Sequence, residues 1–221
     1  MRNLLVIGAA TLLFGSTGNA SAATTITDPA GDFLSTFIGN RDADLDVTRF
    51  TINFDAVTST FLLNAKLAGA IDPGKVGFYV IGVDTGAGAA RPFANVGAPN
   101  VIFDQAIVVQ KNGTGQVTGA AGGALGAGAI TITGDEFSAI VPLSFLPSTG
   151  RTADHYGFNI WPRIGLANNN QISDFAPDNS LIGVAGVPEP ATWLSLLGGF
   201  AIAGGMIRRQ KAGPGFGSAL V

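Results

Sequence analysis

The chain has 221 residues, enough for one domain of ordinary size together with short processing segments. Its formal net charge is -3, and it contains one histidine and no cysteine. The excess of acid disfavours nucleic-acid binding, because the phosphate backbone is also negative. The lack of cysteine excludes disulfide bonds and thiolate metal sites, so stability must come from the core, helped by any bound ions.

Residues 1–22 have the pattern of a secretory signal peptide. Arg2 is followed by an apolar run from Leu4 to Phe14, and small residues occupy positions 20–22, as signal peptidase requires. The run is too short to cross about 30 Å of hydrocarbon, which disfavours a membrane anchor. We therefore expect signal peptidase to remove this segment during export, leaving a domain over residues 23–186.

The middle of the chain alternates short apolar runs, rich in β-branched and aromatic residues, with segments rich in Gly, Pro, Asn and Asp. In one run Val47, Phe50, Ile52 and Phe54 approach an apolar stripe at every second residue. No amphipathic helix of ordinary length interrupts the pattern. The sequence therefore predicts an all-β, antiparallel, jelly-roll-like β-sandwich. The predicted strands are 47–54, 61–67, 77–83, 101–109, 128–133, 137–143 and 156–162.

Two glycine-rich stretches, 86–100 and 112–129, break the strand pattern and predict loops. Neither precedes a predicted helix, so neither is typical of a phosphate-binding loop. Pro142 lies inside a predicted strand. Because proline cannot donate a ladder hydrogen bond, it indicates an edge strand or a bulge.

Groups suited to acid–base catalysis are scarce. His155 is the only histidine, and Glu136 is the only glutamate between the first segment and the tail. The sequence contains neither the G-x-S-x-G motif of serine hydrolases nor the H-E-x-x-H motif of zinc proteases. We expect His155 at the surface and predict a protein without enzymatic activity. A hydrolase is the least favoured alternative.

Aspartates, in contrast, gather in the short segments 28–32, 42–46 and 174–178. Carboxylates on loops with small residues are the hard oxygen ligands that calcium binds. The 42–46 segment lacks the glycine and the distal glutamate of an EF-hand. Two interpretations stay open: aspartates that stabilise turns, or a site for calcium or another cation. The candidate ligands are Asp28, Asp32, Asp44, Asp46, Asp174 and Asp178.

The tail, residues 187–211, combines a proline motif, an apolar run and a basic cluster. The prolines impose an extended backbone on the motif. The apolar run, residues 191–207, is about 26 Å long as a helix, enough to cross a thin bilayer. Basic residues after such a run stay in the cytoplasm, which leaves the preceding domain outside. We predict one transmembrane helix here. The motif is Val187, Pro188, Glu189 and Pro190, and the basic residues are Arg208, Arg209 and Lys211.

This tail resembles the PEP-CTERM sorting signal, also catalogued as the ice-binding protein C-terminal domain. The resemblance implies an exosortase as partner and cleavage near the proline motif. It also implies delivery to the envelope or extracellular matrix of a Gram-negative bacterium, in association with exopolysaccharide and biofilm. The flexible extension 212–221 departs from the pattern, because such tails usually end at the basic cluster.

The segments 28–32, 44–55, 79–89, 137–146 and 173–180 together resemble the bacterial β-sandwich group related to DOMON-like and family 9 carbohydrate-binding domains, over residues 26–182. The first and last strands of such sandwiches often lie side by side. The resemblance therefore implies that four aspartates meet around one calcium ion. They are Asp28, Asp32, Asp174 and Asp178.

Two features limit what the resemblance implies. The central Asp-Thr-Asp turn of the group reads Asp84-Thr85-Gly86 here, so a cation at that turn loses a ligand. Sugar binding needs an exposed aromatic side chain, and the spacing of Tyr156 and Trp161 directs them to opposite faces of a regular strand. We expect Trp161 in the core and Tyr156 as the candidate for stacking on a glycan. A calcium- or carbohydrate-binding module is thus the alternative to a matrix protein defined by its sorting signal.

Overall fold

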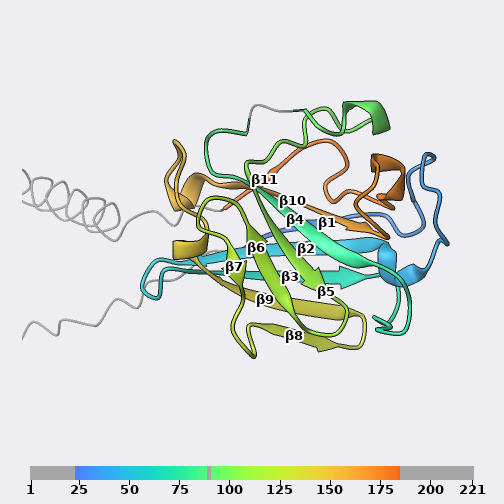
Figure 1. Ribbon diagram of the computed structural model, residues 1–221, viewed down its shortest axis with the longest axis horizontal. Coiled ribbons are helices and arrows are strands. Elements are labelled where there is room, and N and C mark those ends of the chain that lie inside the picture. Colours follow the sequence, from blue (N-terminus) through green and yellow to red (C-terminus); the bar gives the residue numbers. More distant parts are fainter. Residues whose placement is uncertain (1–22, 89–90, 185–221) are drawn as a thin grey trace, which may run out of the picture. The chain divides into compact units, whose positions relative to one another are not determined.

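The computed structural model describes residues 23–88 and 91–184, which form a β-sandwich of two antiparallel sheets (Figure 1). Sheet A has the strand order β1-β2-β3-β9-β8, and sheet B has the order β11-β10-β4-β5-β6-β7. The strands are β1 (Thr24–Thr27), β2 (Val47–Asp55), β3 (Thr60–Leu67), β4 (Phe78–Asp84), β5 (Gln105–Gln110), β6 (Gly115–Thr118), β7 (Gly123–Ala124), β8 (Ile130–Thr133), β9 (Glu136–Pro142), β10 (Gly157–Arg163) and β11 (Ile182–Gly183). The helices are short 3-10 turns: η1 (Ala43–Leu45), η2 (Ala94–Val96), η3 (Leu143–Phe145), η4 (Ala153–His155) and η5 (Asn169–Gln171).

Strand β2 shows how the apolar pattern produces the inner face of sheet A. Phe50 and Ile52 are fully buried, whereas Arg49, before Phe50, and Thr51, between the two, lie on the outer face. Val47 is also buried although it lies three residues before Phe50. A register irregularity in the β2–β3 pairing between Val47 and Arg49 allows this, because a bulge returns the next side chain to the same face.

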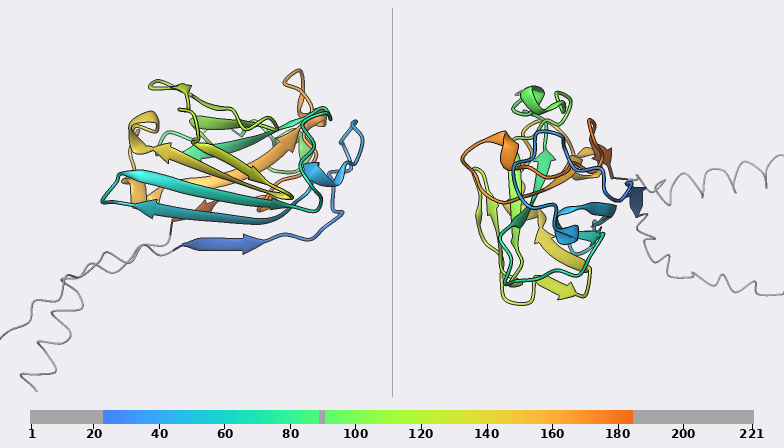
Figure 2. Two further views of the ribbon diagram at one scale, coloured as in Figure 1. Left: turned by 90° about the horizontal axis from the view of Figure 1, so that it is seen from below. Right: turned by 90° about the vertical axis from the view of Figure 1, so that its right-hand side faces the viewer.

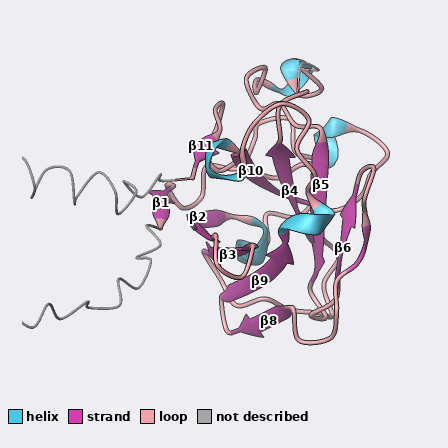
Figure 3. Ribbon diagram, turned by 90° about the vertical axis from the view of Figure 1, so that its left-hand side faces the viewer, coloured by secondary structure: helices cyan, strands magenta, loops and turns pink. Residues whose placement is uncertain are grey.

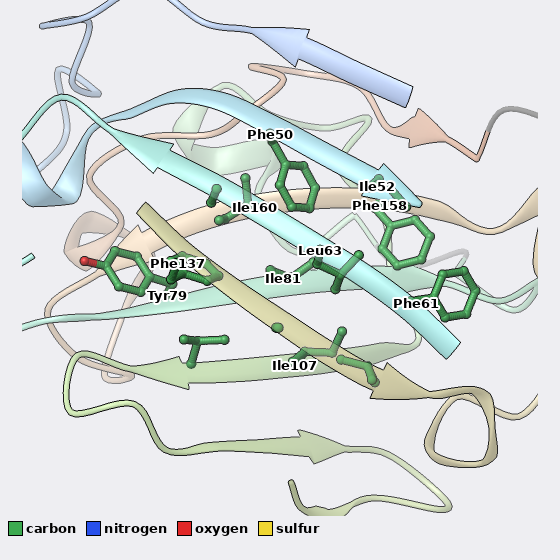
Figure 4. Close-up of a cluster of buried hydrophobic side chains, with 14 of the residues drawn as sticks. Phe50, Ile52, Phe61, Leu63, Tyr79, Ile81, Ile107, Phe137, Phe158 and Ile160 are labelled. Carbon is green, nitrogen blue, oxygen red and sulfur yellow. The ribbon is translucent and has the colours of Figure 1, made fainter. Parts of the chain in front are cut away.

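The main core fills the space between the two sheets, as Figure 4 shows. Phe61 of β3 contacts Phe158 of β10, with ring centroids 5.2 Å apart, and Tyr79 of β4 stacks on Phe137 of β9 at 4.9 Å. Each pair joins one sheet to the other. Seen end-on, the strands of the two sheets lie in separate layers (Figure 3).

A second apolar cluster covers the outer face of sheet B. Trp161 of β10 and Val80 of β4 contact Phe93, Phe103 and Phe175 there. Strand β4 is consequently buried on both faces, which explains its continuous apolar sequence. The described part of the 86–100 stretch therefore contributes a packed cover for sheet B, although the sequence indicated only a loop.

Each of the seven predicted runs contains a strand, with β5 starting four residues later than expected. The 112–129 stretch, predicted as a loop, also holds the short strands β6 and β7. The prediction of an edge strand at Pro142 is wrong, because β9 lies between β3 and β8. Pro142 is the last residue of β9, where a missing donor interrupts the ladder least.

The expectations for residues 1–22 and 187–221 lie outside the described residues. They concern the signal peptide, the sorting motif, the transmembrane helix and the basic cluster. Among the described residues, no helix has the length and apolar character needed to cross a membrane.

Candidate metal centre

Four aspartates from the two ends of the domain meet at one edge of the sandwich. Asp28 directly follows β1, and Asp32 lies four residues later. Asp174 and Asp178 lie between β10 and β11. One carboxylate oxygen from each of the four lies within 4.8 Å of the others. The structure thus confirms that these four residues converge, as the sequence resemblance implied.

The two segments that carry them are joined by backbone hydrogen bonds. The Leu34 N–H donates to the Ser173 carbonyl at 2.8 Å, and the Ile38 N–H donates to the Asn170 carbonyl at 3.0 Å. The Asp28 N–H donates to the Thr48 carbonyl at 3.0 Å, which fixes the start of the first segment on β2. The aspartates are therefore positioned by the fold. Figure 2 shows the segment after β1 (blue) and the segment after β10 (orange) at the same end of the sandwich.

Asp174 is the most deeply placed member, with 1% of its surface exposed. Its Oδ2 accepts the Val47 N–H at 2.9 Å, and its Oδ1 accepts the Phe175 N–H at 2.7 Å. These bonds hold the carboxylate at the entrance to β2 and leave lone pairs free on both oxygens. Asp32 and Asp178 are exposed, so the cluster opens to solvent on their side.

Asp46 lies beside the cluster and supports it. It is 2% exposed, and its Oδ2 accepts the Gly31 N–H at 2.6 Å, inside the turn between Asp28 and Asp32. Gly31 has a φ of 89°, a left-handed conformation that glycine adopts without strain. Asp46 thus holds the turn that presents two of the four ligands. Among the described residues, Oδ1 of Asp46 and Oδ2 of Asp28 are buried and accept no hydrogen bond.

The pKa values of the four clustered aspartates and of Asp46 show how unfavourable negative charge is at this position. Burial, followed by the neighbouring Asp32, Asp178 and Asp46, raises the pKa of Asp28 to about 7. Burial raises the pKa of Asp174 to about 8, with further contributions from Asp28 and Asp32. Burial is also the main cause that raises the pKa of Asp32 and of Asp46. Carboxylates in this state are stabilised by any cation that compensates their charge.

The dimensions of the cluster fit a calcium ion. Calcium binds oxygen ligands at about 2.3–2.6 Å, so two ligands on opposite sides of the ion are about 5 Å apart. The four aspartate oxygens, within 4.8 Å of one another, span no more than that distance. The octahedral sphere of magnesium is smaller, about 4.2 Å across, and tolerates distortion less well. The site also offers carboxylates only, which are ligands for hard cations.

Asp44, a predicted ligand, does not belong to this cluster. The 42–46 segment forms the turn of η1 instead of an extended strand, so its side chains diverge. Oδ2 of Asp44 lies 2.7 Å from Nζ of Lys111 in a buried ion pair. The prediction of Asp44 as a cation ligand is therefore wrong, because a lysine ammonium already compensates its charge.

At the Asp84 turn, too, groups of the protein compensate the negative charge of the carboxylate. Asp84 is buried, its Oδ1 accepts the N–H groups of Gly86 and Gly88 at 3.1 Å, and its Oδ2 lies 2.9 Å from the Arg151 guanidinium. Nearby Asp104 accepts hydrogen bonds from Thr85. Its pKa is lowered overall, because hydrogen bonds outweigh the effect of burial. Groups of the protein itself therefore contact both carboxylates of this turn.

The burial of Trp161 confirms its expected place in the core, whereas the burial of Tyr156 contradicts its predicted role in stacking on a glycan. Each is 1% exposed. They do point in opposite directions, Tyr156 into the main core and Trp161 into the cluster on sheet B. The Tyr156 hydroxyl donates to the Leu146 carbonyl at 3.0 Å, so its polar end is satisfied inside the protein. Residues 91–104 supply the cover over Trp161, which strand spacing alone could not indicate.

His155 is at the surface as predicted, with 73% of its side chain exposed, and it contacts Asp154 at 3.1 Å.

Comparisons with known proteins identify no relative: no family model, curated protein or solved structure matches this chain.

Proposed function

We propose that the domain is a calcium-binding module, in which one ion joins the segment after β1 to the segment before β11. The observation that carries this proposal is the convergence of four carboxylates, with Asp174 almost fully buried, from positions 28–32 and 174–178. Four like charges at this distance repel one another strongly when burial reduces their screening. A divalent cation bound between the carboxylates compensates this repulsion and holds the two ends of the domain together.

The proposal suits a protein that folds after export. Extracellular calcium-binding modules have dissociation constants of roughly 0.1 to 1 mM, which match calcium concentrations outside cells. A site of this affinity stays empty in the cytoplasm and is filled outside. The ion would then stabilise the sandwich where the protein works, in a chain that has no cysteine for disulfide bonds.

The experiment is a calcium titration of the fragment 23–186, which contains both sheets and the whole described core. We expect the melting temperature to rise at millimolar calcium relative to EDTA, since a ligand of the folded state stabilises it. Calorimetry should give one calcium per chain, and magnesium should bind more weakly. No change in melting temperature up to 10 mM calcium, a roughly tenfold excess over the weakest expected affinity, would refute the proposal.

Matched variants separate the site from general acidity. Asp28→Asn removes one charge and keeps the shape, and we expect it to weaken calcium binding by about tenfold or more, because affinity follows the number of charged ligands. Asp154→Asn changes an exposed aspartate beside His155, outside the cluster, and should leave binding unchanged. Equal binding by both variants would show that the calcium effect is nonspecific.

For the whole chain, we propose an exported, non-enzymatic envelope or matrix protein with a jelly-roll-like sandwich, a removable signal peptide and a C-terminal sorting helix. This part rests on the sequence of the two end segments. A label inserted ahead of residue 187 tests it: in cells with an exosortase the label should leave the membrane fraction. Retention there would contradict sorting, whatever the outcome of the calcium titration. Carbohydrate binding is less well supported, because both aromatic candidates are buried.

A further inference from the structure

A buried lysine–aspartate pair that does not belong to the aspartate cluster joins the two sheets. Lys111 directly follows β5 of sheet B, and Asp44 lies in η1, which leads into β2 of sheet A. Nζ of Lys111 lies 2.7 Å from Oδ2 of Asp44. The two side chains are 3% and 2% exposed. Two opposite charges are thus held in contact with almost no water around them.

The hydrogen bonds of this pair are incomplete in a specific way. The Lys111 ammonium has three N–H groups, and its acceptors among the described residues are Oδ2 of Asp44 and the Val76 carbonyl at 3.3 Å. Oδ2 of Asp44 also accepts the Asp72 N–H at 3.1 Å. Oδ1 of Asp44 is buried and has no hydrogen-bond partner among the residues that the structure describes. One carboxylate oxygen and one N–H are therefore left over, which is unfavourable for a buried ion pair.

We propose that Lys111 and Asp44 condense into an intramolecular amide bond, with release of one water molecule. A proton first passes from the ammonium to the carboxylate along the 2.7 Å hydrogen bond, which gives a neutral amine and a carboxylic acid. The Nζ lone pair then attacks Cγ of Asp44. A C–N bond forms and gives a tetrahedral intermediate, in which the second amine proton moves to Oδ1. The C–Oδ1 bond then breaks, and Oδ1 leaves as water with the proton that Oδ2 had received, so that Oδ2 remains as the amide oxygen. No oxidant or reductant is required.

The product satisfies each polar group that the ion pair leaves unpaired. The amide keeps one N–H, which has the Val76 carbonyl as its acceptor, and one oxygen, which accepts the Asp72 N–H. The unpartnered oxygen has left as water, and both buried charges have disappeared. Burial of a neutral, fully hydrogen-bonded amide costs less free energy than burial of an incompletely paired ion pair.

The surroundings favour condensation because they hold the reacting groups together and exclude water. The Tyr79 hydroxyl donates to the backbone carbonyl of Asp44 at 3.0 Å, and the Tyr79 ring stacks on Phe137 in the core. Reactants fixed in contact behave as if present at very high concentration. The amide would join positions 44 and 111, and so lock sheet A to sheet B in a chain that contains no cysteine.

Mass spectrometry of the purified full chain tests the proposal. We expect the protein to be lighter than its sequence by the mass of one water. After denaturation and trypsin digestion, residues 42–49 should be linked to a peptide covering 76–151, because trypsin cannot cleave after an acylated Lys111. Asp44→Ala and Lys111→Arg should both have the mass of their sequences. These measurements do not depend on calcium, so they are independent of the proposed function.

The chain contains its own control. Nζ of Lys66 lies 2.7 Å from Oδ2 of Asp135, the same separation, but these side chains are 36% and 38% exposed. Trypsin should cleave normally after Lys66 in the same digest. A full-mass protein with cleavage after Lys111 would overturn the proposal. So would a loss of water that maps to any other pair of peptides.

Discussion

The stability of the domain without calcium should fall as the pH rises from about 4 to 8. In this interval the folded protein keeps protons on Asp28 and Asp174, whose pKa values are raised to about 7 and about 8. The unfolded chain has already lost them, because an ordinary aspartate has a pKa near 3.8. Stability decreases with pH wherever the folded state binds more protons than the unfolded state.

The magnitude follows mainly from Asp174, which is 1% exposed and therefore poorly screened. A shift from 3.8 to about 8 corresponds to at most about 6 kcal/mol, at about 1.4 kcal/mol for each pH unit. Asp28 is only partly buried and interacts with Asp174, so it adds less than its own shift suggests. At about 2–4 °C per kcal/mol, the melting temperature should drop by about 10 °C between pH 5 and pH 8.

Thermal unfolding of the fragment 23–186 in EDTA, at several pH values, measures this drop. Calcium should reverse it at pH 8 and have little effect at pH 5, where protons compete for the carboxylates. Asp28→Asn should make the pH profile less steep, because it removes one titrating carboxylate and its effect on Asp174, and Asp154→Asn should leave the profile unchanged. A melting temperature in EDTA that stays constant or rises between pH 5 and pH 8 would refute the argument from buried carboxylates.

Three further predictions concern the two apolar clusters. Phe61→Ala should lower the free energy of unfolding by about 3–5 kcal/mol in urea titrations, because the side chain is fully buried, whereas Leu62→Ala, at a site 39% exposed, should cost far less. Trp161 is the only tryptophan of the fragment 23–186, so its emission should be blue-shifted, resist acrylamide quenching and stay constant when glycans are added. Gly82→Ala should cost about 1–3 kcal/mol, because its Cβ would lie 2.5 Å from the Trp161 ring, whereas Gly126→Ala meets open space and serves as the control.

The strands that the sequence predicted are those with a strong local signal. β2, β3 and β9 have one buried and one exposed face, so their apolar residues alternate. The strands it missed, β1, β6, β7 and β11, have two to four residues and too little periodicity to be recognised. Their formation depends on pairing with longer strands, which is a long-range property.

The sequence also predicts only part of the candidate site. The grouping of aspartates at 28–32 and 174–178 is visible in the sequence, and their convergence depends on the hydrogen bonds that join the segment after β1 to the segment after β10. The separate roles of Asp44 and Asp46 are not visible, although only one residue lies between them. Because of the turn of η1, Asp44 contacts Lys111, whereas Asp46 accepts the Gly31 N–H. The burial of Lys111 has no local signal, since the residue lies between a strand and a turn.

The sequence by itself therefore determined the all-β class, the positions of the long strands and the set of carboxylates from which a cation site could form. These depend on local periodicity and residue chemistry. Only the tertiary structure decided which carboxylates share a charge environment, which one is paired with a lysine, and that Tyr156 and Trp161 are both buried. The physical reason is that Coulomb interactions and burial depend on distances in space, and residues more than a hundred positions apart come together only through the fold.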